Sequence, residues 1–463
     1  MKDRAAMTTA TLHSQPSAHP TPRWRAVACA VGWVGAFMAA PSVQAQSLQA
    51  LFDAAQGYDA TYLSALAQYQ ANQARAAQAR AGVLPNVGLS AGANWTHTDS
   101  SLPGQDRTTN AQNLGVAATQ PLFRPANRIA VEQAEVSLRA AEAQLVAARQ
   151  DLIVRTAQAY FDVLAAQDNL TFVKAQKAAV AEQLAAAKRN FEVGTSTITD
   201  TREAQARFDL VTAQEIAAEN DLRVKRLALD QLVGRSGTSP WQLRDGATLP
   251  ELLPADVDQW VGRSQAEHPQ ILQAQAGLDI AQLETRKAES ARLPTLDAKA
   301  QYQVGRGPTN GVPFVYARNH NAVLGVEFNL PLYTGGAVQN RIAESVALED
   351  KARTDLEAAR RGIAQATRAA YFGVVSGLGQ VQALQAAEAS SQSALEANQL
   401  GYQVGVRINI DVLNAQSQLF QTKASLAKAR YDVLVGNLRL RQASGVLKDE
   451  DLQPIGQLLT STP

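Results

Sequence analysis

Two short stretches of this 463-residue sequence are near copies of each other, and they decide how the chain is organised. They read Phe191-Glu-Val-Gly-Thr-Ser-Thr-Ile-Thr-Asp200 and Tyr402-Gln-Val-Gly-Val-Arg-Ile-Asn-Ile-Asp411. Each has one glycine after a long run of helix-forming residues, and glycine readily adopts the backbone conformation that ends a helix. We therefore predict that a long helix ends and the chain reverses at Gly194, and again at Gly405.

Other segments recur at nearly the same spacing. Ala159-Tyr-Phe161 returns as Ala370-Tyr-Phe372, at the offset of 211 that also relates Asp200 to Asp411. A constant offset over this distance indicates a tandem duplication. We predict the following organisation: a signal peptide (1–45), a first structural repeat (46–245), a linker (246–255), a second repeat (256–450) and a C-terminal tail (451–463).

Each predicted repeat begins with a helix, over 48–83 and over 268–291. Both helices end at a Leu-Pro pair, because the residue before a proline is disfavoured in helical conformation. Residues 87–95 and 296–304 then alternate between apolar and polar types, which is typical of a strand with one apolar face.

A returning strand completes a hairpin in each repeat. Turn-forming residues fill 100–106 and 305–311, and a second alternating segment follows, most clearly at 324–330. Each repeat should therefore carry one β-hairpin between helices.

The longest predicted element runs from 126 to 193 without a glycine or a proline. A helix of that length extends about 100 Å at 1.5 Å per residue. A heptad seam of Leu, Ala and Val supports coiled-coil packing, and it occupies positions 138, 145, 152, 159, 166, 173 and 180. Residues 337–400 form the counterpart, and a further helix returns after each turn.

The N-terminal 45 residues have the pattern of a secretory signal peptide. Arg23 and Arg25 precede an apolar run over 26–40, which is shorter than the roughly 20 residues of a membrane span. Small residues lead to a predicted cleavage site after Ala45. An uncleaved anchor, lipid attachment at Cys29 and a later start codon are the alternatives, and the short apolar stretch before Cys29 argues against lipidation.

Composition excludes several functional classes. The formal net charge of +1 provides no basic field for nucleic acid. The single cysteine lies in the leader, which excludes a disulfide framework and a thiolate zinc site after cleavage. No nucleophile–base pair, metal-ligand spacing or phosphate-binding loop is present, so we expect no catalytic residue, no cofactor and no metal.

Two architectures fit the predicted elements. The first is a periplasmic coiled-coil scaffold without a membrane barrel. The second is a membrane-spanning sheet, which requires every strand edge to be paired. Four strands in one chain cannot close a barrel, whereas three chains would supply twelve.

The segment from Gly401 to Ala415 resembles the periplasmic-tip signature of the TolC family of outer-membrane channel proteins, and residues 191–200 resemble it in the first repeat. The resemblance covers essentially the whole chain after the leader. It implies a mainly α fold with a β-barrel part, in which a homotrimer forms a 12-stranded outer-membrane β-barrel continuous with a long periplasmic α-helical barrel. The expected location is the outer membrane of a Gram-negative bacterium, with contacts to its lipid.

The same resemblance implies a passive exit duct and not an enzyme. Such a duct belongs to a tripartite export system, either type I protein secretion or small-molecule efflux. It opens when a periplasmic adaptor (membrane fusion) protein and an inner-membrane pump dock. The pump is an ABC exporter or a proton-driven multidrug pump. The sequence does not decide between protein and small-molecule cargo, although the absence of a lipid-attachment cysteine favours type I secretion.

Site residues are also implied by the resemblance. Tyr402, Arg407 and Asp200 match a latch between the two helix tips, and Asp411 matches an acidic constriction ring. Asn414 stands where the family often has a second aspartate, so we expect only weak block by cations. The adaptor would contact the tips at Val193, Gly194, Thr195, Val404, Gly405 and Val406. Solvated charges and ordinary turn chemistry are the alternative interpretation of these residues.

Overall fold

The computed structural model describes residues 46–99, 101, 107–244, 246–308 and 316–460. The predicted signal peptide lies outside this range, as does most of the predicted loop at 100–106. The fold below therefore concerns the part of the chain that follows the leader.

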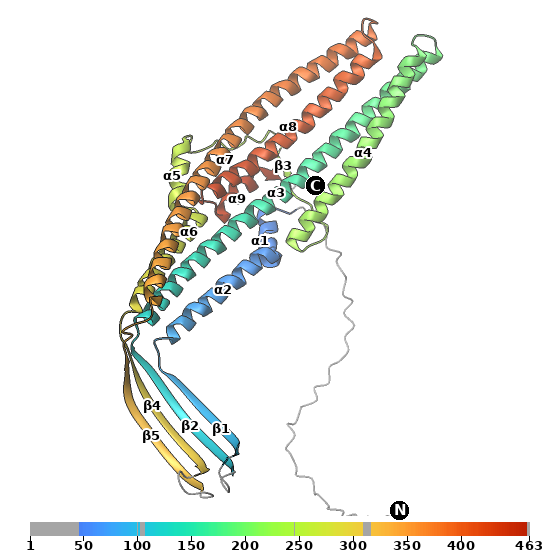
Figure 1. The fold of residues 1–463 in the computed structure, drawn as a ribbon. Coiled ribbons are helices and arrows are strands. Elements are labelled where there is room, and N and C mark those ends of the chain that lie inside the picture. Colours follow the sequence, from blue (N-terminus) through green and yellow to red (C-terminus); the bar gives the residue numbers. More distant parts are fainter. Residues whose placement is uncertain (1–45, 100, 102–106, 245, 309–315, 461–463) are drawn as a thin grey trace, which may run out of the picture. The chain divides into compact units, whose positions relative to one another are not determined.

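The described elements occur in the same order twice, as Figure 1 shows. The first set comprises α1 (Leu48–Tyr58), α2 (Ala60–Ala81), β1 (Asn86–Thr98), β2 (Arg107–Phe123), α3 (Pro125–Glu192) and α4 (Ile198–Val233). The second comprises α5 (Val257–Glu267), α6 (Pro269–Ser290), β4 (Thr295–Pro308), β5 (Tyr316–Asn329), α7 (Ala337–Gln403) and α8 (Asn409–Ala443). The predicted tandem helix–hairpin–helix unit is thus confirmed, while its boundaries at 245 and 256 stay predictions.

The helical segment that begins each repeat is divided in two. The prediction was wrong for the first repeat, whereas the helix predicted over 268–291 agrees with α6. The single helix expected over 48–83 is α1 followed by α2, with Asp59 in an extended conformation between them. The Asp59 carboxylate accepts a bond from the Tyr62 N–H at 2.8 Å and caps α2. Both of its oxygens also bind Arg155 of α3, at 2.9 and 3.0 Å.

The second repeat breaks at the equivalent place, and the prediction missed the preceding helix α5. His268 separates α5 from α6, and its Nδ1 accepts a bond from the Gln270 N–H at 3.2 Å. Pro269 occupies the first position of α6, where its missing N–H costs nothing. A capping side chain ends one helix and begins the next in both repeats.

The four long strands form one antiparallel sheet in the order β1-β2-β4-β5. Residues 305–308, which we expected in a loop, continue β4 and pair with the start of β5 up to Pro308↔Tyr316. Turn-forming residues are held in this strand by ladder hydrogen bonds with β5, which local sequence does not reveal.

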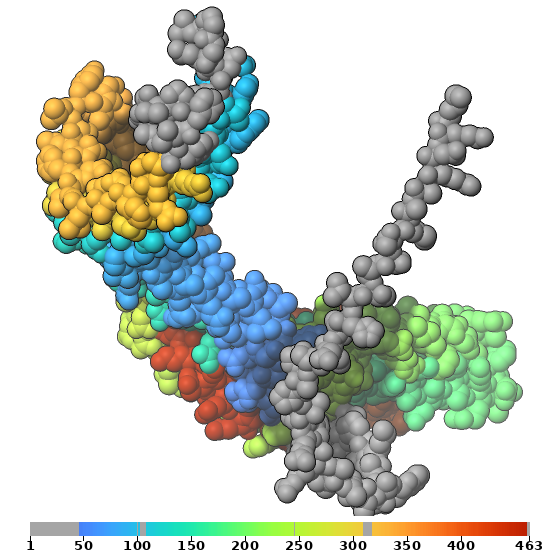
Figure 2. Space-filling view, turned by 90° about the horizontal axis from the view of Figure 1, so that it is seen from below, coloured from blue at the N-terminus to red at the C-terminus, as the bar shows by residue number. Residues whose placement is uncertain are grey.

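The helices α3 and α7 contain 68 and 67 residues, so each extends about 100 Å. Because α3 and α7 each begin within a few residues of a strand, their far ends and the sheet lie at opposite ends of this part of the chain (Figures 1 and 2). None of the described helices has an apolar stretch long enough to cross a membrane.

The main hydrophobic core lies midway along the helices, where α1, α3, α4 and α8 meet. Phe161 stacks on Tyr431 with ring centroids 5.5 Å apart, and the buried Tyr160 hydroxyl donates to the Trp241 carbonyl at 2.9 Å. Burial raises the pKa of Tyr160. In the second repeat Tyr371 bonds equivalently, to the Ala255 carbonyl.

The C-terminal segment that we predicted as a tail packs on this core. It forms a 3-10 turn η1 (Asp449–Asp451), α9 (Leu452–Gln457) and β6 (Leu459–Thr460). The short strand β6 pairs with β3 (Gln242–Leu243), which follows the first repeat. Leu452, Ile455 and Leu459 are buried, so residues 451–460 belong to the folded body.

Candidate functional site at the helix tips

The two helix reversals have the same backbone geometry. Gly194 has φ of 77° and Gly405 has φ of 81°, a region that other residues rarely adopt. Thr195 donates its N–H to the Asn190 carbonyl at 2.8 Å, and Val406 donates to the Gly401 carbonyl at 2.9 Å. The predicted reversals at Gly194 and Gly405 are therefore confirmed, and they place the two predicted tips at the ends of α3–α4 and α7–α8.

Both tips present apolar side chains to solvent. The exposed fractions are 73% for Val193, 65% for Val404 and 76% for Val406. The other predicted contact residues, Gly194, Thr195 and Gly405, lie beside them in the turns. Val193 on the first turn, and Val404 with Val406 on the second, therefore give each tip exposed apolar surface.

The equivalent aspartates Asp200 and Asp411 have different partners. Asp200 closes a capping box: its Oδ2 accepts the Thr197 N–H at 2.9 Å and the Thr197 hydroxyl at 2.8 Å. In the second repeat Ile408 stands at the position of Thr197 and provides no side-chain cap. The Asp411 carboxylate instead faces Arg407, with 3.7 Å between Oδ2 and Nη1.

Arg407 is fixed by its aliphatic stem. Its Cγ lies so close to Gly401 that a Cβ there would be only 2.6 Å away. The side chain is nevertheless 59% exposed, so the guanidinium reaches solvent. A glycine one turn before the reversal thus allows the arginine stem to lie against the helix while its charged end stays accessible.

Amide side chains connect the two tips within one chain. Asn190 donates to the Tyr402 hydroxyl oxygen at 3.4 Å, and Asn409 donates to the Asp200 carbonyl at 3.5 Å. Gln183 also donates to the Asn409 side chain. The structure therefore brings Tyr402 and Asp200 to the contact between tips, whereas the only ion pair of Arg407 among the described residues is with Asp411.

Asn414 also has a partner, one turn further from the tip. Arg207 of α4 donates from Nη2 to the Asn414 Oδ1 at 2.7 Å. The predicted constriction position is therefore next to a cation from the other helix pair. A carboxylate at this place would form an ion pair across the two coiled coils.

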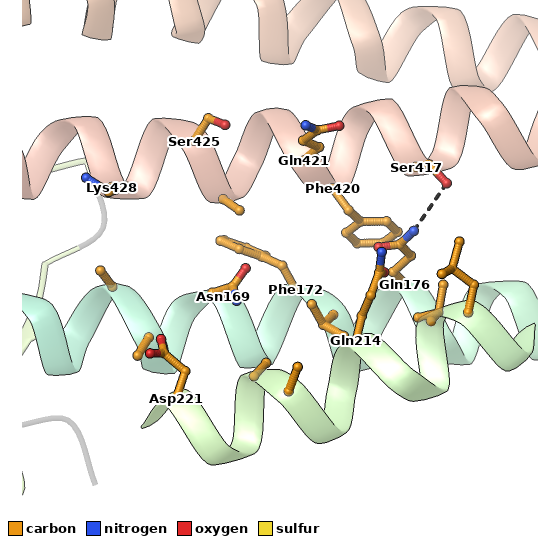
Figure 3. Close-up of a pocket in the computed structure, with 18 of the residues that line it drawn as sticks. Asn169, Phe172, Gln176, Gln214, Asp221, Ser417, Phe420, Gln421, Ser425 and Lys428 are labelled. Atoms are coloured by element: carbon orange, nitrogen blue, oxygen red, sulfur yellow. Dashed lines mark hydrogen bonds between the residues drawn. The ribbon is translucent and has the colours of Figure 1, made fainter. Parts of the chain in front are cut away.

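Beyond these contacts the two helix pairs separate. A groove of about 800 Å³ lies between α3, α4 and α8 (Figure 3). Phe172 and Phe420 project into it from α3 and α8, and Gln176 donates to the Ser417 hydroxyl at 3.2 Å. Near the tip the α3–α4 pair is joined to α8 by these polar bonds and by an apolar cluster in which the fully buried Leu413 of α8 packs against Val180 and Leu184 of α3.

Sequence reasoning missed the residues that make these bonds, namely Gln183, Asn190, Arg207 and Asn409. Asn409 carried one signal, because it stands between Ile408 and Ile410, and in the structure it is 1% exposed. A buried amide has to be hydrogen-bonded.

The described residues contain no group of three His, Cys, Asp or Glu that could hold a metal.

Comparisons with known proteins agree on one family. The family described as Outer membrane efflux protein matches residues 51–235 and 260–446. The outer membrane protein TolC of Vibrio cholerae is 33% identical over 415 residues, covering 89% of this chain and 94% of that protein. The alkaline protease secretion protein AprF of Pseudomonas aeruginosa is 30% identical, with 85% and 83% covered.

A solved structure has the same fold. The outer membrane protein VceC of Vibrio cholerae superposes with a TM-score of 0.74 at 21% identity, covering 86% of this chain and 96% of that chain. The repeated element order, the matched reversals and these relatives lead to one conclusion. The chain belongs to the outer membrane efflux protein family, which includes TolC.

Proposed function

We propose that three copies of this chain close one outer-membrane β-barrel and one periplasmic helical tunnel, and that the tips described above form its gate. The protein is an outer-membrane exit duct and not an enzyme. The sheet is the observation that best supports a trimer. Its two edges are β1 and β5, and each pairs on one side only in the described chain.

The sheet has the two faces that a lipid-embedded wall needs. Leu89, Val116 and Tyr302 lie opposite one another on one face, exposed by 74%, 44% and 50%. Ser90, Gly115 and Gln303 alternate with them on the other face. In hydrocarbon an unpaired edge is costly, so β5 of each chain would pair with β1 of the next. Three chains then give twelve strands.

The gate is held in this proposal by bonds within and between chains. Asp200 Oδ1 takes no hydrogen bond from the described residues, and Arg407 holds its guanidinium in solvent. An arginine of one chain bonding to Asp200 of its neighbour would complete the latch with Tyr402. Such bonds contribute roughly 0.5–3 kcal/mol each, which a docked partner can override.

The partners follow from this arrangement. The exposed valines of both tips provide the surface for a periplasmic adaptor, which would connect the duct to an inner-membrane pump. AprF is a protease secretion protein by name, and the matching family is described as an outer membrane efflux protein. Both protein secretion and small-molecule efflux therefore remain candidate cargo classes, with either an ABC exporter or a proton-driven pump as the energy source.

The chain would reach the membrane through its leader. We propose cleavage after Ala45, leaving Gln46 as the first residue. Mass spectrometry of the protein extracted from membranes should find this N-terminus. A chain that begins at an acylated Cys29 would contradict both the cleavage and the absence of a lipid anchor.

The proposed duct is tested by expressing the full-length gene, purifying the protein from membranes and reconstituting it. Extraction should require detergent, light scattering should give three chains per particle, and planar bilayers should show discrete conductance steps. A coiled-coil scaffold would extract without detergent and produce no steps. A trimer that extracts without detergent would disprove the membrane barrel while leaving the helical assembly in place.

A further inference from the structure

Two arginines face each other across the strands β4 and β5. Arg306 pairs directly with Arg318 in the antiparallel register, and directly opposite residues have their side chains on the same face. Both side chains are exposed. Among the described residues neither guanidinium has an ion pair or a hydrogen bond. Like charges in directly opposite positions are unfavourable, so this pair calls for a counter-anion.

The pair lies on the apolar face of the sheet. Arg306 follows Tyr302 and Val304 at the strand period of two, and Arg318 precedes His320 in the same way. Residues that pair directly across neighbouring strands form a row across the sheet. The row that contains Arg306 and Arg318, here called the arginine row, is one step beyond the row of Leu114, Val304 and His320. At about 3.3 Å per residue that step is roughly 7 Å, towards the strand ends far from the helices.

The apolar rows end at the arginines. From the row of Leu296 and Phe328 to that of Val304 and His320 the face spans roughly 26 Å along the strand at 3.3 Å per residue. The apolar band of a membrane barrel is about 25 Å tall, and tilted strands shorten the projection. The two arginines thus stand at the edge of the band on the side opposite the helices.

Aromatic residues mark the same edge. Trp95 of β1 is 74% exposed and lies one row beyond the arginines on this face. Tyr302 lies two rows before them and bonds to His320 at 3.0 Å. Tryptophan and tyrosine favour the boundary between lipid tails and headgroups. The arginine row falls between these two aromatic residues.

Among the residues that the structure describes, no carboxylate forms an ion pair with either arginine on this face. Gln112 of β2 completes their row, and the rows on either side contain Leu114, Val304 and His320 or Asn110, Pro308 and Tyr316. None of these side chains is acidic. The nearest described ion pairs of the sheet, His97–Asp99 and Lys299–Glu327, do not include either arginine.

We infer that Arg306 and Arg318 form a binding site for the phosphate groups of a lipid headgroup in the membrane leaflet that faces away from the helices. Guanidinium groups bind phosphate in a planar, bidentate manner. The apolar rows next to the pair would contact the acyl chains, which favours a phosphorylated lipid over free phosphate. The inference rests on the proposed membrane position of the sheet.

The experiment compares binding of two defined glycolipids to the detergent-solubilised full-length trimer by native mass spectrometry. The probes are lipid A with both phosphates and the same lipid after phosphatase treatment. The wild type should prefer the phosphorylated form, and R306Q/R318Q should lose this preference by roughly thirtyfold in affinity. The matched control R128Q/R361Q removes two exposed arginines from α3 and α7 and should keep it.

Retention of the wild-type preference by R306Q/R318Q would overturn the site. Equal loss in R128Q/R361Q would also overturn it, because the effect would then follow net charge alone. Free inorganic phosphate that competes as well as the lipid would show an anion site without lipid specificity, contrary to the inference. Failure of the wild type to insert into bilayers would instead defeat the proposed function, and conductance of the same preparations separates the two results.

Discussion

One substitution between the repeats changes the role of an aspartate at the tip. Thr197 binds Asp200 in a capping box, whereas Ile408 at the equivalent place leaves Asp411 to pair with Arg407. One carboxylate oxygen of Asp200 therefore caps α4, and the other can accept a hydrogen bond from a partner. Asp411 contributes its charge next to a cation. The sequence motif is the same, and the residue three positions earlier decides what the carboxylate does.

The latch leads to a prediction at this scale. Tyr402→Phe with Arg407→Ser removes the hydroxyl that accepts from Asn190 and the exposed guanidinium that faces Asp411. Serine is the residue of the first repeat at the position of Arg407. Loss of about 1–3 kcal/mol from the closed state shifts the closed-to-open ratio by roughly 5- to 150-fold. Single-channel conductance should rise with trimers intact. Arg202→Ser, another exposed tip arginine, is the control, and an unchanged double variant would disprove the latch.

The contact between Arg207 and Asn414 gives a second prediction. Asn414→Asp adds a carboxylate to each chain, but Arg207 Nη2 lies only 2.7 Å from the side chain and would neutralise it. Block by divalent cations should therefore change little. Combining Asn414→Asp with Arg207→Gln should strengthen the block, while Arg207→Gln alone serves as the control. Block is measured in planar bilayers. Equal block in Asn414→Asp and in the combined variant would show that Arg207 does not shield this position.

At the scale of elements, alternation is the property that decides which strand residues tolerate charge. The register places Leu89 and Val116 opposite each other on the apolar face, and Ser90 with Gly115 on the other. The helices have a different pattern, since α3 and α7 pack along seams and meet α6 near the sheet. Charged substitutions in the strands should therefore affect assembly in the membrane. The helices contain a partly buried ionic contact whose contribution to stability depends on pH.

Leu89→Arg should impair assembly, whereas Ser90→Arg should be tolerated. An arginine on the lipid face near the bilayer midplane costs about 2–4 kcal/mol, and the lumen face is solvated. The fraction of heat-resistant trimer on gels measures the difference. Similar trimer yields for the two variants would mean that β1 does not face lipid.

Glu284 of α6 connects three helices close to the sheet. It accepts bonds from Gln133 of α3 at 2.9 Å, from Arg341 of α7 at 2.9 Å and from Lys287 at 3.3 Å. The Gln133 bond above all, followed by those from Arg341 and Lys287, lowers the pKa of Glu284 to about 2 from 4.5. The folded state thus favours the carboxylate.

Because the pKa is lower in the folded state, this stabilisation is complete above pH 4.5 and is lost as pH falls towards 2. Glu284→Gln should reduce the free energy of unfolding by roughly 1.5–3 kcal/mol at pH 7. Thermal unfolding of both proteins from pH 7 to pH 2 should show the difference shrinking below pH 4.5. A difference that is constant with pH would assign the effect to packing and not to the charge.

At the scale of the whole molecule, the duplication made most of the fold predictable. Spacing identified α3, the hairpins and both reversals, because glycine and periodicity act locally. It missed the break at Asp59, since a single polar residue inside a helical pattern does not reveal that it will cap, and it missed the helix α5 before His268. It also missed residues 305–308 as strand, because turn-forming residue types there are held by pairing with β5, and Asn190 as the partner of Tyr402, because the two are 212 positions apart.

The proposed trimer depends on closure of the sheet between chains. The single cysteine lies in the leader, so the chain after Ala45 contains no thiol, and two introduced cysteines would react only with each other. Closing a barrel staggers the register between strands, so Ala91→Cys in β1 is combined in turn with cysteine at each position of β5 (Tyr316–Asn329). Oxidation of the assembled protein in membranes is then followed by denaturing gels. We predict covalent dimers and trimers for at least one pairing, because β5 of one chain adjoins β1 of the next. Cross-links confined to single chains, or monomers at every pairing, would contradict a barrel closed by three chains.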